Sequence, residues 1–346
     1  MMPEEWPLAA FAADQNAPAR PAGRDRLATV RVDFFLNPAE RLTEQERALM
    51  TAMLHCLIGD IADEIRALLP NREVPANDEG NLAIVDILQS ARLLDRIGLV
   101  RRLLRRADEE RITTGARSRI GRREARVIQG LVSHKDGAVA AAAMALIIAR
   151  GRRRDRFGQC LLHFDDLPRE ETRALVRFTA AALRLDLVGA AGKAEADRLL
   201  NAAGSQLLAS HDPGSSIENL TATLVRLLDE EHDLNDELIG AAGIEGEMNF
   251  VAHSLARRSG IAGDVALDEL LSGVSDRIMM LFRIGGLRRE TAASLIAAIG
   301  DLIGIADPGQ AIARFDGISD ADVADSMSWL NADPAYQAAV GVLGDH

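Results

Sequence analysis

The chain has 346 residues, of which 48% are apolar, 27% charged and 3% aromatic, and its formal net charge is −12. This length and composition are typical of one large or two ordinary globular domains, each able to bury a full core. The 28 glycines, 11 prolines and 2 cysteines exclude collagen-like, low-complexity and disulfide-scaffold proteins.

The first thirty residues and the two cysteines indicate the cellular compartment of the protein. The N-terminal residues are acidic and proline-containing, with no basic segment ahead of a long apolar one, so we expect no signal peptide. No window approaches about 18 uninterrupted apolar residues, so we expect no membrane span. Cys56 and Cys160 lie among apolar residues and are expected to be buried and reduced. The sequence therefore predicts a cytoplasmic protein.

In chain order, residues 1–30 read as a flexible arm rich in proline and alanine. Residues 30–34 alternate in polarity, and we interpret them as extended chain laid on the body, because a single strand has nothing to pair with. Thr43 and Glu46 form a capping box that begins a helix, and apolar residues at helical spacing continue until Pro70 ends it.

Nearly every later segment is also predicted to be helical. Ser215 and Glu218 form a second capping box, and Asp307-Pro308 and Asp333-Pro334 each place an N-cap before a first-turn proline. The helices expected after the one that ends at Pro70 are 82–90, 95–112, 122–132, 138–150, 153–163, 168–185, 194–209, 215–233, 236–244 and 248–258. Short amphipathic helices at loose spacing, without identity at a fixed period, favour an all-α fold of stacked helix hairpins in a HEAT-like repeat.

Charge divides the chain more clearly than hydrophobicity does. Residues 1–187 hold 30 cations and 27 acids, a net charge of +3, whereas residues 188–346 hold 10 cations and 25 acids, a net charge of −15. We therefore expect a boundary near Leu187–Gly192. The predicted organisation is an arm at 1–30, a HEAT-like helical domain at 31–187, and at 188–346 an acidic helical domain or a continuation of the repeat array.

An arginine stripe is the densest feature of the sequence. Between Arg92 and Arg126 lie twelve arginines and five acids, several of them four residues apart and so on one helix face. Guanidinium groups near a helix N-terminus suit phosphate or carboxylate. The candidate anion-binding residues are Arg101, Arg102, Arg105, Arg106, Arg117, Arg119, Arg122 and Arg123. The alternative is that these arginines pair with the protein's own carboxylates, including those of the acidic half.

Other constellations give weaker signals. No Walker motif or G-x-G-x-x-G follows a strand, so nucleotide hydrolysis is not supported. Cys160 and His163 are too few for a structural zinc site, and Glu231-His232-Asp233 is most simply a charged helix end. We therefore expect no catalytic residue, metal ligand or cofactor.

Several segments resemble a known bacterial family. Phe34-Phe35-Leu36, the run Arg41–Met50, Asp236-Glu237-Leu238 and the stretch from Phe250 to Gly260 are similar to alphaproteobacterial proteins grouped as domain of unknown function 2336, as are Gly286-Leu287 and residues 333–336. The resemblance spans about residues 31–340. It implies an all-helical, HEAT-like cytoplasmic protein, and it supplies no reaction, cofactor or catalytic residue.

The function expected from these observations is that of a non-enzymatic helical-repeat scaffold or adaptor that binds a protein partner. One alternative is a module that binds an anion, a nucleotide or nucleic acid through the stripe between Arg101 and Arg126. A second alternative is an enzyme on a HEAT-like shell. The expected partners are thus a protein, or a phosphate-bearing ligand or nucleic acid, and not a membrane.

Overall fold

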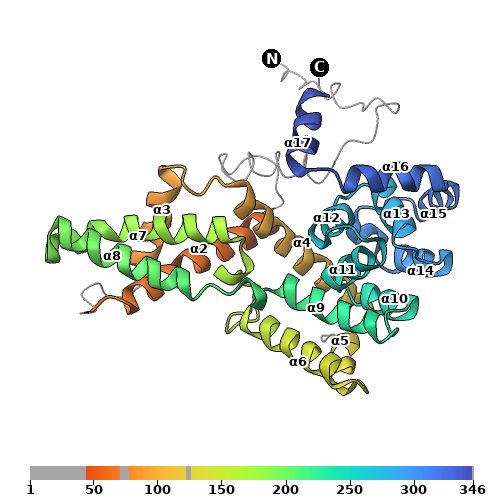
Figure 1. Ribbon diagram of the computed structural model, residues 1–346, viewed down its shortest axis with the longest axis horizontal. Coiled ribbons are helices and arrows are strands. Elements are labelled where there is room, and N and C mark those ends of the chain that lie inside the picture. The colour runs from red at the N-terminus through yellow and green to blue at the C-terminus, as the bar shows by residue number, and fades with distance from the viewer. Residues whose placement is uncertain (1–43, 71–77, 122–125, 345–346) are drawn as a thin grey trace, which may run out of the picture.

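A computed structural model describes residues 44–70, 78–121 and 126–344, and these residues fold almost entirely into helices (Figure 1). The α-helices are α2 (Glu44–Ala67), α3 (Asp78–Ser90), α4 (Ile97–Arg119), α5 (Arg126–Gly130), α6 (Gly137–Arg152), α7 (Arg169–Ala191), α8 (Lys193–Ala209), α9 (Ile217–Glu230), α10 (Asp236–Ile244), α11 (Met248–Ser259), α12 (Gly263–Leu270), α13 (Ser275–Ile284), α14 (Arg289–Ile299), α15 (Pro308–Gly317), α16 (Asp320–Leu330) and α17 (Pro334–Leu343). Short 3₁₀ helices are η2 (Leu131–Ser133), η3 (Phe164–Asp166), η4 (Pro213–Ser215) and η5 (Gly300–Ile303). The all-α fold class is confirmed.

The helices bury two hydrophobic cores. One core lies among α2, α3, α7, α8 and the first half of α4, and includes Met50 and Leu103. The other lies among α5, α6 and the helices from α9 to α16, and includes Phe250 and Phe282. Figure 1 places the two groups of helices at opposite ends of an elongated molecule.

Helix α4 connects the two cores. Its residues Leu99, Leu103 and Ala107 belong to the first core, whereas Ile112 and Ala116, further along the same helix, belong to the second. In Figure 1, α4 lies between α2 and the α11–α14 group. Side chains on α4 therefore reach segments that follow it by more than 100 residues.

Most helices lie where the sequence predicts them, but residues 153–163, also predicted to be helical, are not a helix. They form a tight turn closed by an antiparallel bridge between Arg154 and Cys160. The Asp155 carboxylate accepts hydrogen bonds from the backbone N–H groups of Phe157 and Gln159, and Gly158 adopts a positive φ of 81°. Such side-chain-to-backbone bonds compete with helix formation, so the helix predicted there was wrong.

The capping predictions are confirmed at two sites and wrong at a third. Asp307 and Asp333 accept hydrogen bonds from backbone N–H groups at the starts of α15 and α17. Ser215 belongs to η4, and Ser216 instead caps α9 by accepting from the N–H of Asn219 at 3.2 Å. The one-residue shift of the cap follows from η4, which occupies the chain just before the helix.

Some expectations concern segments outside the described residues, namely the arm, the extended segment at 30–34 and Thr43. The boundary expected near residues 187–192 falls at the end of α7 and the turn into α8, and both of these helices contribute to the first core. The division into domains stays a prediction. No helix among the described residues is both long and apolar enough to span a bilayer.

The turn between α10 and α11 makes a close contact with α4. Gly246 has a φ of +79°, and a Cβ atom added there would lie 2.7 Å from the Cα of Thr113. The Thr113 hydroxyl donates to the carbonyl oxygen of Gly246 at 2.8 Å. Only glycine combines this backbone conformation with so close an approach to a neighbouring helix.

We predict that Gly246→Ala lowers the free energy of unfolding by about 3 kcal/mol or more, because it adds a backbone clash to the cost of a positive φ. Gly260→Ala is the matched control, since Gly260 has a φ of +78° but no atom within 4 Å of the added Cβ. The control is expected to lose only about 1–2 kcal/mol. Urea unfolding of both variants measures the difference, and equal losses would contradict the role given to this contact.

Candidate functional site

The arginines of α4 meet carboxylates from several distant helices. Arg102 pairs with Glu218 on α9, their atoms Nη1 and Oε1 lying 2.9 Å apart. Arg105 donates to a carboxylate oxygen of Asp268 on α12 at 2.7 Å, and also to the carbonyl oxygen of Asp264 at 3.0 Å. These arginines thus join α4 to the acidic half of the chain.

Two more candidates lie near the C-terminal end of α4. Arg117 Nη2 donates to Glu247 Oε1 at 2.7 Å. Arg119 makes a two-pronged contact with Asp301 in η5, with N–O distances of 2.6 and 2.5 Å. Hydrogen bonds from Arg119 hold the pKa of Asp301 below its ordinary value. Both contacts again cross from α4 to the second core.

The remaining candidates divide into three cases. Arg106 is buried and contacts Glu109 at 2.9 Å, Glu218 at 3.3 Å and Asp166 at 4.0 Å. Arg101 is half-buried on α4 and also interacts with another group of the protein. Arg122 and Arg123 lie outside the described residues.

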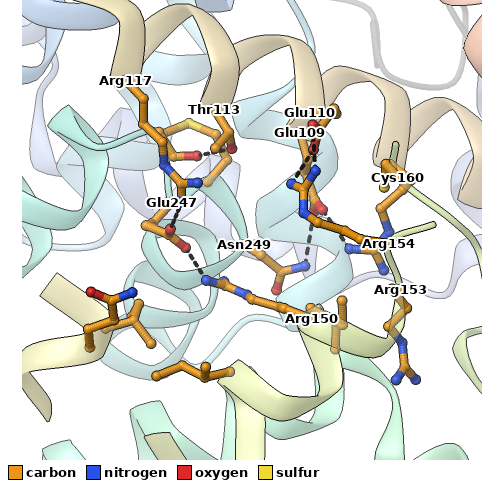
Figure 2. Close-up of a pocket in the computed structure, with 17 residues that line it drawn as sticks. Glu109, Glu110, Thr113, Arg117, Arg150, Arg153, Arg154, Cys160, Glu247 and Asn249 are labelled. Carbon is orange, nitrogen blue, oxygen red and sulfur yellow. Dashed lines mark hydrogen bonds and ion pairs between the residues drawn. The ribbon is translucent and has the colours of Figure 1, made fainter. Parts of the chain in front are cut away.

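A partly open cavity of about 260 Å³ lies where α4, α5, α6, α9, the turn at 153–160 and the α10–α11 turn come together (Figure 2). Its charged and polar lining residues are Arg106, Glu109, Glu110, Thr113, Arg117, Gln129, Arg150, Arg153, Arg154, Glu247 and Asn249. Two candidate residues of the arginine stripe, Arg106 and Arg117, therefore line the cavity. The other lining residues were not associated with them in the sequence.

The cavity's ion pairs connect its walls. Arg150 on α6 lies 2.6 Å from Oε2 of Glu247, whose other oxygen accepts from Arg117. Arg154 binds both oxygens of Glu110, at 3.0 and 2.8 Å. Figure 2 shows Arg117 and Arg150 reaching Glu247 from α4 and α6, while Arg153 points away from the cavity. Two guanidinium groups thus share the single Glu247 carboxylate.

Asp166, just behind this cavity, is a buried ion-pair centre. Its carboxylate accepts from Nε and Nη2 of Arg153 at 2.9–3.0 Å and from the backbone N–H groups of His163 and Ile217. Burial opposes its ionisation, but the charge of Arg106 and the hydrogen bonds from Arg153 outweigh that cost, so the pKa of Asp166 is lowered. Asp166 thereby ties the 153–167 segment to the start of α9.

Two proton-donating side chains of the cavity, Glu109 and Cys160, have raised pKa values. Burial raises the pKa of Glu109, and the nearby Arg106 offsets part of that rise. Burial also raises the pKa of the Cys160 thiol to about 11, so Cys160 is protonated at neutral pH and is a poor nucleophile. Cys160 is buried, as expected, but Cys56 is exposed, which corrects the expectation that both are buried.

The weaker constellations do not form a site. Cys160 and His163 lie in the non-helical stretch ahead of η3, and the described residues hold no group of three metal-ligating side chains. Asp233 pairs instead with Lys135 at 3.0 Å and with His134 at 3.1 Å.

Sequence reasoning missed Glu109, Glu247 and Asn249 as members of the site. Arg150, Arg153 and Arg154 belong to a second basic cluster at 150–156, which was the one available signal that α6 and the following turn face the stripe. The missed acids carry no local signature, because Glu109 is one of several charged residues within α4 and Glu247 is a single Glu just ahead of α11.

We predict that Asp166→Ala lowers the free energy of unfolding by about 3–5 kcal/mol at pH 7, because it leaves buried Arg153 without its carboxylate. The pKa of Asp166 is lower in the folded protein than its ordinary value of 3.8. The stabilisation is therefore complete above about pH 5 and is lost only as the pH falls through the folded-state pKa.

Glu230→Ala is the control, since the exposed Arg226–Glu230 pair on α9 is worth about 0.3–0.5 kcal/mol. Denaturant unfolding of both variants between pH 5 and 8 measures the effect. A loss for Asp166→Ala no larger than that of the control, or one that vanishes by pH 6, would contradict this account.

Comparison with known proteins identifies the family. No curated protein and no solved structure matches the chain. Residues 119–322 match a family model described as an uncharacterised protein conserved in bacteria, DUF2336. The match begins at the C-terminal end of α4, runs into α16 and contains the cavity residues contributed by α5, α6 and the α10–α11 turn. Because more than half of the chain is covered, the protein belongs to the DUF2336 family.

Proposed function

We propose that the protein is a non-enzymatic interaction scaffold of stacked, HEAT-like helix pairs, acting in the cytoplasm, and that its contact surface is the outer face of α6. Two features support a scaffold over an enzyme. The ionisable groups of the cavity pair with one another, and the Cys160 thiol is held in its protonated form. Nucleic-acid binding along α4 is not favoured, because the stripe arginines Arg102, Arg105 and Arg119 are occupied by the protein's own carboxylates.

The composition of α6 is the observation that carries this proposal. Its only charged residues are Arg150 and Arg152 at its C-terminal end, and the rest are alanine, glycine and larger apolar residues. One face packs on α9 through residues that include Val139 and Leu146. A helix that is apolar on every side is usually covered on every side.

The opposite face of α6 is left uncovered by the residues that the structure describes. Ala141, Met144, Ala145 and Ile148 recur at helical spacing, and Met144 and Ile148 are 42% and 49% exposed. Figure 1 places α6 at an outer edge of the molecule. The alanines would let a second helix approach closely, while the two larger side chains would supply the buried apolar area.

Charge placement favours a second copy of the chain as the partner. In an antiparallel pair with its two-fold axis at Met144, Arg152 of one copy lies opposite Asp136 of the other, since each is eight residues from Met144. Arg152 is exposed and has no ion-pair partner among the described residues. The same register therefore aligns the apolar stripes and pairs their charged ends.

The contact is expected to be weak. Helix α6 has 16 residues, and at 1.5 Å per residue it is about 24 Å long. One such face buries less than the roughly 800 Å² per partner of a standard stable interface. We therefore expect a dissociation constant in the micromolar range.

Sedimentation equilibrium of the full chain over a concentration series tests the proposal. We expect a reversible dimer that Met144→Asp and Ile148→Asp each convert to monomer, because a carboxylate would be buried in the apolar contact. Arg152→Ala is expected to weaken the dimer and to reduce its sensitivity to salt.

Leu185→Asp is the matched control, since Leu185 is a 67% exposed apolar residue on a different helix, α7. It should leave the dimer unchanged. A wild-type chain that stays monomeric at several hundred micromolar, or a dimer that the control disrupts as strongly, would refute the use of α6 as the contact surface.

A further inference from the structure

The ion-pair network around the cavity carries more positive than negative groups. Its arginines are Arg102, Arg106, Arg117, Arg150, Arg153 and Arg154. Its carboxylates are Glu109, Glu110, Asp166, Glu218 and Glu247. Six cations therefore face five anions in this network, an excess of one positive charge.

The surplus is located at the cavity itself. Arg117 and Arg150 both depend on Glu247, at 2.7 and 2.6 Å, so each has only part of one carboxylate. Within the described chain the Arg150 guanidinium has no partner besides Glu247, although its side chain is only 25% exposed. Guanidinium N–H groups held in this way are available to an anion.

Buried polar atoms without a hydrogen-bond partner gather at the same place. Among the described side chains, such atoms include Nε of Arg106, Nε of Arg117 and Oδ1 of Asn249, all from residues that line the cavity. Asn249 is only 3% exposed, and its amide nitrogen donates to Glu109 at 2.9 Å. Unsatisfied buried groups are rare in native proteins, and a bound water, ion or small molecule is one of the explanations for them.

Figure 2 shows how these groups are arranged. The Asn249 amide lies between Glu109 on α4 and the Arg150 side chain on the opposite wall, beside the Arg117–Glu247–Arg150 bridge. Guanidinium donors and an acceptor without a partner thus adjoin one another in a cavity of about 260 Å³. Pockets for drug-sized ligands are larger, about 300–1,000 Å³, so only a small molecule would fit.

We propose that this cavity binds a small phosphate monoester that carries a hydroxyl group, with the phosphate between Arg117 and Arg150 and the hydroxyl donating to Asn249 Oδ1. A phosphate dianion offsets the surplus of arginines, and its oxygens accept from guanidinium forks. The hydroxyl supplies the donor that the buried carbonyl oxygen of Asn249 lacks. This site uses the inner face of α6 and is independent of the contact surface proposed above.

Isothermal titration calorimetry of the full-length protein with glycerol 3-phosphate, methyl phosphate and glycerol tests the site. We expect saturable binding of glycerol 3-phosphate, weaker binding of methyl phosphate, and none of glycerol. Arg150→Gln should weaken binding of both phosphates about tenfold or more, because it removes a charge-assisted donor. Arg117 still pairs with Glu247 in this variant, so the fold should be retained.

Asn249→Leu gives a second, distinct readout. It should abolish the preference for glycerol 3-phosphate over methyl phosphate, because the acceptor for the hydroxyl is removed. Arg156→Gln is the matched control, since Arg156 is an exposed arginine near the same turn that does not line the cavity. It should bind both phosphates as the wild type does.

Three results would overturn the proposal: no saturable binding of either phosphate to a wild-type protein with the expected helical circular dichroism, equal weakening by Arg150→Gln and Arg156→Gln, or tight binding of glycerol alone. None of these bears on self-association, because Met144 and Ile148 do not line the cavity. A wild-type chain that binds phosphate but does not form a dimer would refute only the contact surface.

Discussion

The arginine–carboxylate pairs of α4 determine how the two ends of the molecule are joined. Arg102, Arg105 and Arg119 are paired with carboxylates on α9, α12 and η5, each more than 100 residues later in the chain. Removing such charges from water is costly, and a partly buried pair is stabilising only where its geometry is good. Their main effect is therefore to fix which helices lie against α4, while the two cores on either side supply the apolar burial.

This pairing gives the charge asymmetry of the chain a structural meaning. The N-terminal 187 residues are slightly basic and the remainder strongly acidic, and α4 is where arginines of the first part meet acids of the second. Arginine suits this role better than lysine because its planar fork binds two oxygens at once, as Arg119 does with Asp301 and Arg154 with Glu110. Only two of the chain's 40 cations are lysines, Lys135 and Lys193.

Local sequence predicted the helices well and the site poorly. The bounds of α10 and the caps at Asp307 and Asp333 depend on neighbouring residues, which periodicity and capping rules describe. The turn at 153–163 was misread because its apolar and basic residues also suit a helix, and the Asp155 backbone contacts that break it become visible only in the structure.

The site itself depends on tertiary contacts. Arginine density marked Arg106 and Arg117, but their partners Glu218 and Glu247 lie 112 and 130 residues away. No periodicity links such distant positions in a single sequence. The same limit explains Asn249: as one of several polar residues in α11 it gives no signal until its unpartnered oxygen is seen beside the cavity.

Helix α6 contributes residues to both proposed sites, the cavity and the contact surface. Its inner side brings Arg150 to Glu247 at the cavity, and its outer side carries the uncovered apolar stripe of Met144 and Ile148. Apart from the short α5–η2 segment, α6 is held chiefly by α9. Arg150 belongs to the cavity, whereas Met144 and Ile148 do not line it. One helix thus presents chemically different groups on two sides, guanidinium donors toward the cavity and apolar side chains away from it, so each proposal can be tested by variants that leave the other surface unchanged.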